Sequence, residues 1–116
     1  MNYVSTRDKT VSLSASQAIA QGLAWDGGLL TPEVLPKLTP ELFQDLVGKS
    51  YGQRAVAVMK LFLEDFSEEE LTRYTQAGYS AEKFDDSRIA PLHSINEDTY
   101  CLELWHGSTS AFKDMA

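Results

Sequence analysis

The sequence predicts an α+β fold: a small, mostly helical N-terminal domain with an N-terminal strand, followed by a short β-hairpin. Apolar residues recur at helical spacing between residues 12 and 78, in segments that begin with capping hydroxyls. Residues 92–105 instead alternate apolar and polar side chains around a turn-forming Asn-Glu-Asp. Residues 2–6 are short and compatible with a strand.

The first helix is expected just after the N-terminal strand. Either Ser12 or Ser14 can cap it, and Gln17 stands three residues after Ser14, the spacing of a capping box. Gly22 is a natural end for this helix. Its apolar face comprises Ala15, Ala18, Ile19 and Leu23. The following Asp-Gly-Gly at 26–28 predicts a tight turn, and residues 29–31 a short extended segment that ends at a proline.

Three further helices are expected in the middle of the chain. Thr39-Pro40-Glu41 combines a capping hydroxyl, a proline at the first helical position and an acid in the first turn, so a helix should run to about residue 47. Residues 51–66 show a broad apolar stripe, which predicts the longest helix, buried on more than one side. Ser67 and Glu70 form a capping box that starts the last of the three.

The C-terminal part is predicted to be less regular. Residues 80–90 read as a polar, irregular segment, followed by a hairpin with strands at 92–95 and 99–105. Residues 106–110 are expected to form a loop, and residue 111 to begin a helix. The sequence includes about one turn of that helix. We therefore expect the sequence to be a truncated piece of a longer protein.

Charge and composition exclude several classes of function. The chain has 10 Lys and Arg against 17 Asp and Glu, a formal net charge of -7, so nucleic acid and anionic membrane surfaces are not expected partners. Cys101 is the only cysteine, which suits a cytoplasmic location. The first 20 residues lack the apolar run of a signal peptide, and no stretch could span a membrane. His93 and His106 lack the ligand spacing of a metal site, so none is predicted.

The strongest chemical signal lies at residues 102–116, where a strand leads through a loop of small hydroxylated residues to Lys113. A lysine at a helix start feels the positive end of the helix dipole, which disfavours its ammonium form. A neutral amine is the form required for Schiff-base chemistry. The small residues before it allow backbone N–H groups to approach a ligand closely.

This run reads Leu-Glu-Leu-Trp-His-Gly-Ser-Thr-Ser-Ala-Phe-Lys-Asp. It resembles the lysine signature of pyridoxal-phosphate (PLP) enzymes of fold type II, the tryptophan-synthase-like fold, and especially of threonine synthases. Those typically read Leu-Glu-Leu-Phe-His-Gly-Pro-Thr-x-Ala-Phe-Lys-Asp, so this chain departs at Trp105 and Ser108. Residues 21–33 resemble a second threonine synthase block, Gly-Leu-x-x-Asp-Gly-Gly-Leu, and residues 3–7 fit the start of the family. The matches extend over essentially the whole chain.

The resemblance implies a function for the full-length protein in threonine biosynthesis. Threonine synthases are lyases that convert O-phospho-L-homoserine and water into L-threonine and phosphate with PLP. Lys113 would be the catalytic residue that holds the cofactor, and Ser108, Thr109 and His106 would lie beside the substrate. The resemblance also implies an N-terminal domain at 1–90 and the beginning of the PLP domain at 91–116. The family's glycine-rich phosphate loop lies further downstream, so the fragment alone should bind no PLP and be inactive.

Two alternatives remain open at this point. The chain could belong to another fold-type II PLP lyase or dehydratase, because the lysine block is shared with such enzymes. It could also be a small acidic helical interaction domain without catalysis. In the truncated fragment, the exposed strand at 99–105 offers an edge for self-association.

Overall fold

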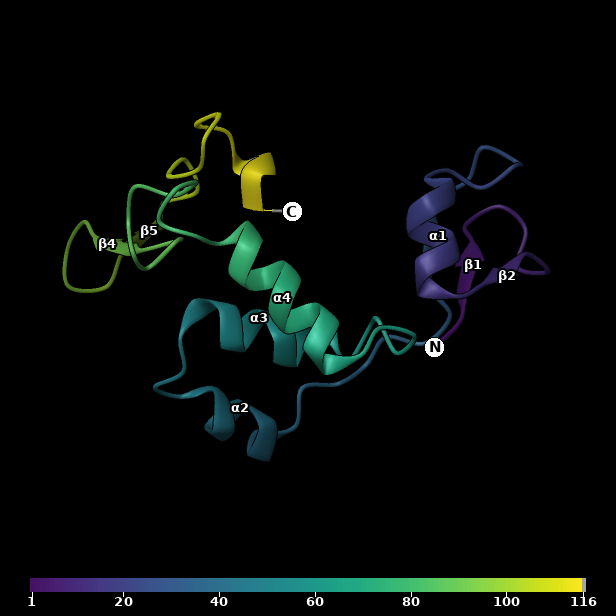
Figure 1. Ribbon diagram of the computed structural model, residues 1–116, viewed down its shortest axis with the longest axis horizontal. Helices are drawn as coiled ribbons and strands as arrows, with labels where there is room; N and C mark the ends of the chain where they lie inside the picture. The colour runs from purple at the N-terminus through teal and green to yellow at the C-terminus, as the bar shows by residue number, and fades with distance from the viewer. Residues whose placement is uncertain (116) are drawn as a thin grey trace.

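The computed structural model describes residues 1–115. The chain begins with a three-stranded antiparallel sheet in the order β2-β1-β3, formed by β1 (Tyr3–Ser5), β2 (Ser12–Leu13) and β3 (Leu30–Pro32). Helix α1 (Ala15–Gln21) lies beside this sheet at one end of the molecule (Figure 1). The predicted N-terminal strand and first helix are both confirmed, and Ser14 rather than Ser12 is the cap.

A buried hydrogen-bonded turn holds this sheet together. The hydroxyl of Ser5, which is 0% exposed, lies 2.8 Å from both carboxylate oxygens of Asp26. The N–H of Gly28 donates to the same carboxylate over 2.8 Å. A β-carbon on Gly28 would lie 2.2 Å from the Ser5 hydroxyl oxygen, so only glycine fits there. The predicted Asp-Gly-Gly turn is thus present, and it is closed by a buried serine of β1.

Three helices occupy the middle of the molecule, α2 (Pro40–Leu46), α3 (Tyr51–Met59) and α4 (Glu68–Gly78). Thr39 caps α2, and α3 and α4 each begin with a complete capping box, in which the serine accepts from the third residue and that residue accepts from the serine N–H. Helices α3 and α4 pack against each other and bury Val56 and Leu71.

The predicted helix at 51–66 is wrong in its length, because α3 ends at Met59. After α3 the backbone tightens into turns in which an N–H donates to the carbonyl three residues back, as from Phe62 to Met59 over 2.9 Å. The Phe62 carbonyl in turn accepts a hydrogen bond from the Tyr3 hydroxyl over 3.0 Å. The apolar stripe continues past Met59 because these turns pack toward the N-terminal sheet, not because the helix continues.

The C-terminal part contains the predicted hairpin, formed by β4 (Leu92–Ser94) and β5 (Tyr100–Leu102), with Leu92 opposite Leu102. The second strand is shorter than the predicted 99–105. The expected helix at residue 111 is a single 3-10 turn, η1 (Phe112–Met115), within the described residues. The Tyr79 hydroxyl donates to the Met115 carbonyl over 3.0 Å and ties this turn to the end of α4.

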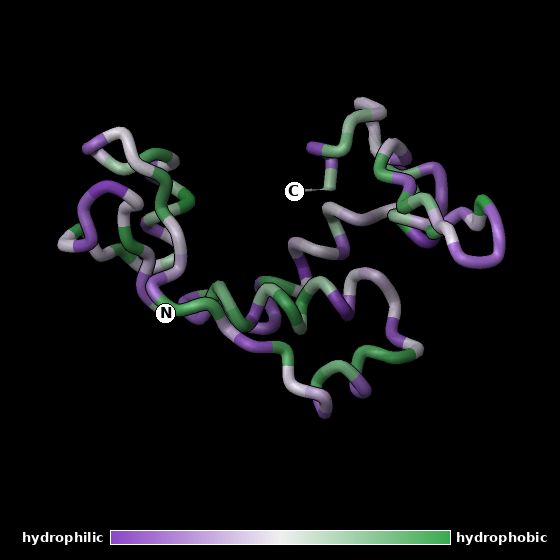
Figure 2. Tube along the Cα trace, turned by 180° about the vertical axis from the view of Figure 1, so that it is seen from behind, coloured by the Kyte–Doolittle hydropathy of each residue, from purple (hydrophilic) through white to green (hydrophobic). Residues whose placement is uncertain are grey.

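The molecule is extended for its length. Its radius of gyration is 16.4 Å, whereas a compact domain of this size has about 13 Å. Helices α2, α3 and α4 lie between the N-terminal sheet and the hairpin (Figure 1). Most of the loop that joins β4 to β5 is hydrophilic (Figure 2). Buried apolar side chains are few, and large ones are exposed at both ends of the molecule, including Trp25, Leu92, Tyr100, Leu102 and Phe112.

Within residues 1–115, no helix is long and apolar enough to cross a membrane. The same residues contain no cluster of His, Cys, Asp and Glu that could hold a metal ion.

Candidate cofactor-lysine loop

All four predicted site residues lie in one short stretch of chain. His106 follows the hairpin, Ser108 and Thr109 are exposed in the loop, and Lys113 is exposed in η1. Ala116, which ends the run at 102–116, lies outside the described residues. The geometry of the loop between His106 and Lys113 therefore decides how the lysine amine is presented.

Asp114 fastens this loop to the 3-10 turn. Its carboxylate accepts hydrogen bonds from the Thr109 backbone N–H over 2.8 Å and from the Thr109 hydroxyl over 2.6 Å. These hydrogen bonds, the hydroxyl's first, lower the pKa of Asp114. A β-carbon on the buried Gly107 would lie 2.4 Å from that of Asp114, so a glycine is required where the loop passes the turn. Because Asp114 is the neighbour of Lys113, this clasp fixes the backbone from which the lysine side chain extends.

The loop also turns on itself. The Ser110 N–H donates to the Gly107 carbonyl over 3.0 Å. Ser110 has a φ of 56°, in the left-handed region that non-glycine residues seldom adopt. The strained residue and the Asp114 clasp together define a compact turn over residues 107–110.

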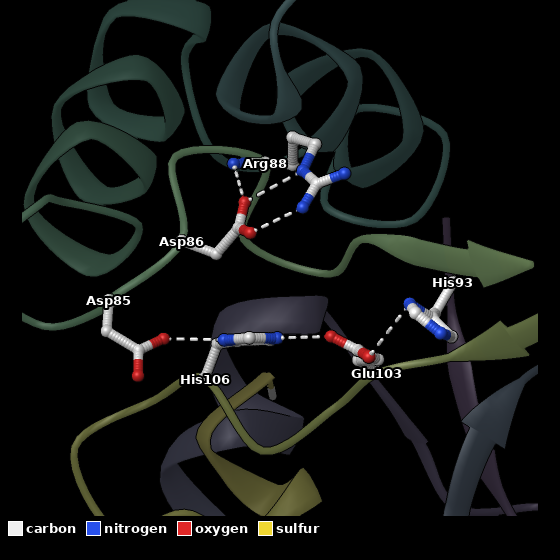
Figure 3. A network of polar contacts seen from close by, with 6 residues as sticks. All are labelled: Asp85, Asp86, Arg88, His93, Glu103 and His106. Carbon is white, nitrogen blue, oxygen red and sulfur yellow. Dashed lines mark hydrogen bonds and ion pairs between the residues drawn. The ribbon is translucent and has the colours of Figure 1, made fainter.

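His106, at the start of the loop, lies between two carboxylates (Figure 3). Its Nδ1 lies 2.5 Å from Asp85 Oδ1, and its Nε2 lies 2.7 Å from Glu103 Oε2. The hydrogen bond to Glu103, and then that to Asp85, raise the pKa of His106 above its usual 6.5. The Glu103 carboxylate also lies 4.0 Å from His93. The imidazole ring thus joins the end of the hairpin to the segment that precedes it.

Asp86 and Arg88 flank this group (Figure 3). The Arg88 guanidinium donates to both carboxylate oxygens of Asp86, over 3.0 and 2.6 Å, and the Arg88 N–H donates to the same group over 2.8 Å. These hydrogen bonds hold the pKa of Asp86 well below its usual range. The pair fixes the turn that follows Asp85.

Sequence reasoning missed the partners that arrange the loop. No role in the loop was predicted for Asp114 or for Glu103. Asp85 stands 21 residues before His106 in an irregular segment, and no periodic pattern marks it. The spacing of Glu103 and His106, three residues apart across the end of a strand, is a signal that could have suggested their contact.

Comparison with known proteins gives consistent matches. The family model described as the threonine synthase N terminus matches residues 2–79. The threonine synthase of Pseudomonas aeruginosa is 37% identical over 117 residues, which cover 100% of this chain and 24% of that protein. The chain therefore belongs to the threonine synthase family.

Solved structures give the same result. The PLP-bound threonine synthase of Brucella melitensis superposes with a TM-score of 0.90 at 38% identity, over 98% of this chain and 24% of that one. The yeast threonine synthase superposes with a TM-score of 0.86 at 35% identity, over 97% of this chain and 23% of that one. The chain thus spans about a quarter of the length of these relatives and corresponds to their N-terminal region, and the predicted α+β fold class is confirmed.

Proposed function

We propose that this chain forms the N-terminal part of an enzyme that converts O-phospho-L-homoserine and water into L-threonine and phosphate, with Lys113 as the residue that holds PLP. The observation that supports this most strongly is the exposed Lys113 at the end of the signature, in a chain of the threonine synthase family. The PLP-bound structure of the Brucella melitensis relative supports the choice of cofactor. PLP, when bound, supplies an electron sink for carbanions formed on the substrate.

The residues around Lys113 fit this cofactor. The lysine is exposed, as a side chain that must reach a carbonyl carbon has to be. The Asp114 clasp keeps the adjoining backbone in one arrangement, which limits the positions that the amine can reach. Lys113 would bind the cofactor and afterwards move a proton between substrate carbons as a general acid and base.

Ser108 and Thr109 are proposed to contact the substrate. The Ser108 hydroxyl donates to the Lys83 carbonyl over 3.3 Å and the Thr109 hydroxyl donates to Asp114, so both oxygens keep lone pairs that can accept from a substrate ammonium or hydroxyl. His106 was predicted beside the substrate as well. Both of its ring nitrogens face carboxylates, so its direct contact with substrate stays a prediction.

Further parts of the proposal concern the whole protein. We place the boundary between the N-terminal domain and the start of the PLP domain near residue 90, at the irregular segment that precedes β4. We place the protein in the cytoplasm, which its single cysteine suits. We also propose that the 116-residue chain, when alone, is inactive and self-associates through residues 99–105.

The test uses a complete threonine synthase that carries this sequence as its N-terminal region. Borohydride reduction in the presence of PLP followed by peptide mapping should place the cofactor on Lys113. Lys113→Ala should remove the visible absorbance of lysine-bound PLP and the activity, and Lys37→Ala, at another exposed lysine, should change neither. A specific PLP adduct that persists in Lys113→Ala would overturn the assignment. A 2-oxo acid in place of threonine as the product would identify a dehydratase instead.

The chain alone gives a second, independent measurement. Its only adjacent glycines are Gly27 and Gly28, which are used in the Asp26 turn. We therefore expect slow, unsaturable modification at several lysines when PLP is added to the 116-residue chain. A single saturable site on Lys113 would show that the elements needed to hold the cofactor lie within this region.

A further inference from the structure

The contacts of His106 favour its protonated form. Its side chain is 14% exposed and lies between Glu103, which is 19% exposed, and Asp85, which is 78% exposed. A neutral imidazole has one N–H and could donate to only one of them. The other ring nitrogen would then turn a lone pair toward a carboxylate oxygen at 2.5 or 2.7 Å. The arrangement therefore selects an imidazolium that donates to both carboxylates.

The backbone around His106 is attached to the same segment as its ring. The His106 carbonyl accepts a hydrogen bond from the Asp85 N–H over 3.1 Å, and the Ser108 hydroxyl reaches the Lys83 carbonyl. Trp105 stacks on the imidazole, with ring centroids 5.5 Å apart and an interplanar angle of 26°. The near end of the loop is thus fixed at His106, and its far end is fixed at the Asp114 clasp.

We propose that His106 is a positioning residue, which fixes the 107–110 loop against residues 83–85 by donating from both ring nitrogens, to Glu103 and to Asp85, and thereby sets where Lys113 is presented. Its effect on Lys113 rests on the function proposed above, whereas the attachment of the loop does not. In this role His106 acts through the loop and not on the substrate.

The charge of His106 makes this attachment depend on pH. Besides Glu103 and Asp85, the ionisable groups that surround the ring are His93 beside Glu103, and Asp86 paired with Arg88 (Figure 3). Because the folded pKa is raised, the stabilisation is complete below the unfolded value of 6.5 and is lost as the pH rises through the folded pKa. The loop should therefore be held most firmly in mildly acidic solution, and it should loosen as the pH rises through the folded pKa of His106.

The first measurement is a nitrogen-15 NMR titration of His106 in the 116-residue chain. Both ring nitrogens should be protonated at pH 6.5, and Glu103→Gln should lower the pKa of His106 more than Asp85→Asn, because Asp85 is far more exposed to water. Asp98→Asn, the same change at an exposed carboxylate in the hairpin turn, should leave this pKa unchanged. A neutral His106 at pH 6.5 would overturn the proposal.

The second measurement is the hydrogen-exchange protection of the Ser110 amide, the factor by which its proton exchanges more slowly than that of an unstructured peptide at the same pH. Protection should fall as His106 loses its proton, a dependence that packing alone would not produce. His106→Phe keeps a ring beside Trp105 but has no N–H, and should lower this protection by about tenfold or more. Glu103→Gln, which retains an acceptor, should lower it less. If the protection of the Ser110 amide changed neither with pH nor in the two variants, the positioning role of His106 would be refuted.

The third measurement separates this inference from the function of Lys113. In the complete enzyme, His106→Phe should weaken PLP binding by about tenfold while Lys113 remains the only modified lysine. Unchanged PLP affinity would overturn the effect of His106 on Lys113. Conversely, Lys113→Ala should leave the His106 titration and the Ser110 protection as they are, so that a failure of the Lys113 assignment would be seen separately.

Discussion

The carboxylate of Asp65 accepts a hydrogen bond from the backbone N–H of Ser16, with 2.8 Å between oxygen and nitrogen. Ser16 lies in the first turn of α1, and Asp65 lies in the turns that follow α3, 49 residues later. A helix start leaves N–H groups without intrahelical partners, and a carboxylate there is also favoured by the helix dipole. This hydrogen bond thus joins α1, which lies beside the N-terminal sheet, to the turns that follow the central helix α3.

This contact predicts a pH-dependent stability. Hydrogen bonds from Ser16, side chain first and then backbone, lower the pKa of Asp65 from its usual 3.8 to about 2. Because the folded pKa is depressed, the stabilisation is present above about pH 4 and is lost as the pH falls from 4 toward 2. Asp65→Asn should lower the free energy of unfolding at pH 7 by about 1 kcal/mol or less, since the group is exposed.

Urea unfolding of both proteins between pH 7 and pH 3 checks this. The difference between wild type and Asp65→Asn should shrink as the solution is acidified. Asp98→Asn, at a carboxylate in the hairpin turn, is the matched control and should leave the midpoint unchanged. A difference that stays constant over this pH range would mean that the Asp65 charge contributes nothing.

The second prediction concerns two glycines. In Gly28→Ala the new β-carbon would lie 2.2 Å from the buried Ser5 hydroxyl oxygen and 2.9 Å from Asp26 Oδ1, so the variant should be less stable by about 2 kcal/mol or more. Gly78 is the last residue of α4, and a β-carbon added there would meet no neighbouring part of the chain within 4 Å. Gly78→Ala should leave stability unchanged or raise it by up to about 1 kcal/mol. Equal effects in chemical denaturation would contradict the structure.

The third prediction concerns the start of α4. Ser67 accepts from the Glu70 N–H and donates its own N–H to the Glu70 side chain, over 3.2 and 2.9 Å. Ser67→Ala removes the side-chain half of this capping box and should cost about 1 kcal/mol in the free energy of unfolding. Ser87→Ala, at an exposed serine in the irregular segment, serves as the control and should cost a few tenths at most. A helical circular dichroism signal that melts alike in the two variants would contradict the capping role.

Features set by neighbouring residues could be predicted from the sequence, whereas features set by contacts between distant residues could not. Thr39 and Ser67 were predicted as helix starts and Ser14 as one of two candidates, and all three cap, because capping depends on residues within one turn. The end of α3 could not be predicted, since the tightened turns after Met59 are held by contacts from Tyr3 and Ser16, which are 59 and 49 residues from their partners in sequence. Asp85 escaped prediction for the same reason, because it stands 21 residues before His106, whereas Glu103 is only three residues from His106 and its contact could have been suggested from the sequence. The Lys113 loop was found because its signal is a contiguous run.

The last prediction concerns self-association through the hairpin. Strand β5 pairs only with β4 within the described residues, so its other edge has unpaired backbone groups. Leu92 and Leu102 are register partners on one face, and Tyr100 lies two residues along on the same face. These side chains are 63%, 52% and 60% exposed, and burial of each would contribute roughly 1.5–3 kcal/mol.

An exposed edge beside an apolar face should therefore pair with a second copy of the chain. We expect light scattering coupled to size-exclusion chromatography to show a concentration-dependent dimer at micromolar to millimolar protein. Leu102→Lys places a charge on the face that the dimer would bury and should abolish it. Leu35→Lys puts the same charge on an equally apolar side chain, 73% exposed in the irregular segment before α2, and should leave the dimer intact. A chain that stays monomeric throughout, or a dimer that both variants weaken equally, would show that the hairpin is not the contact.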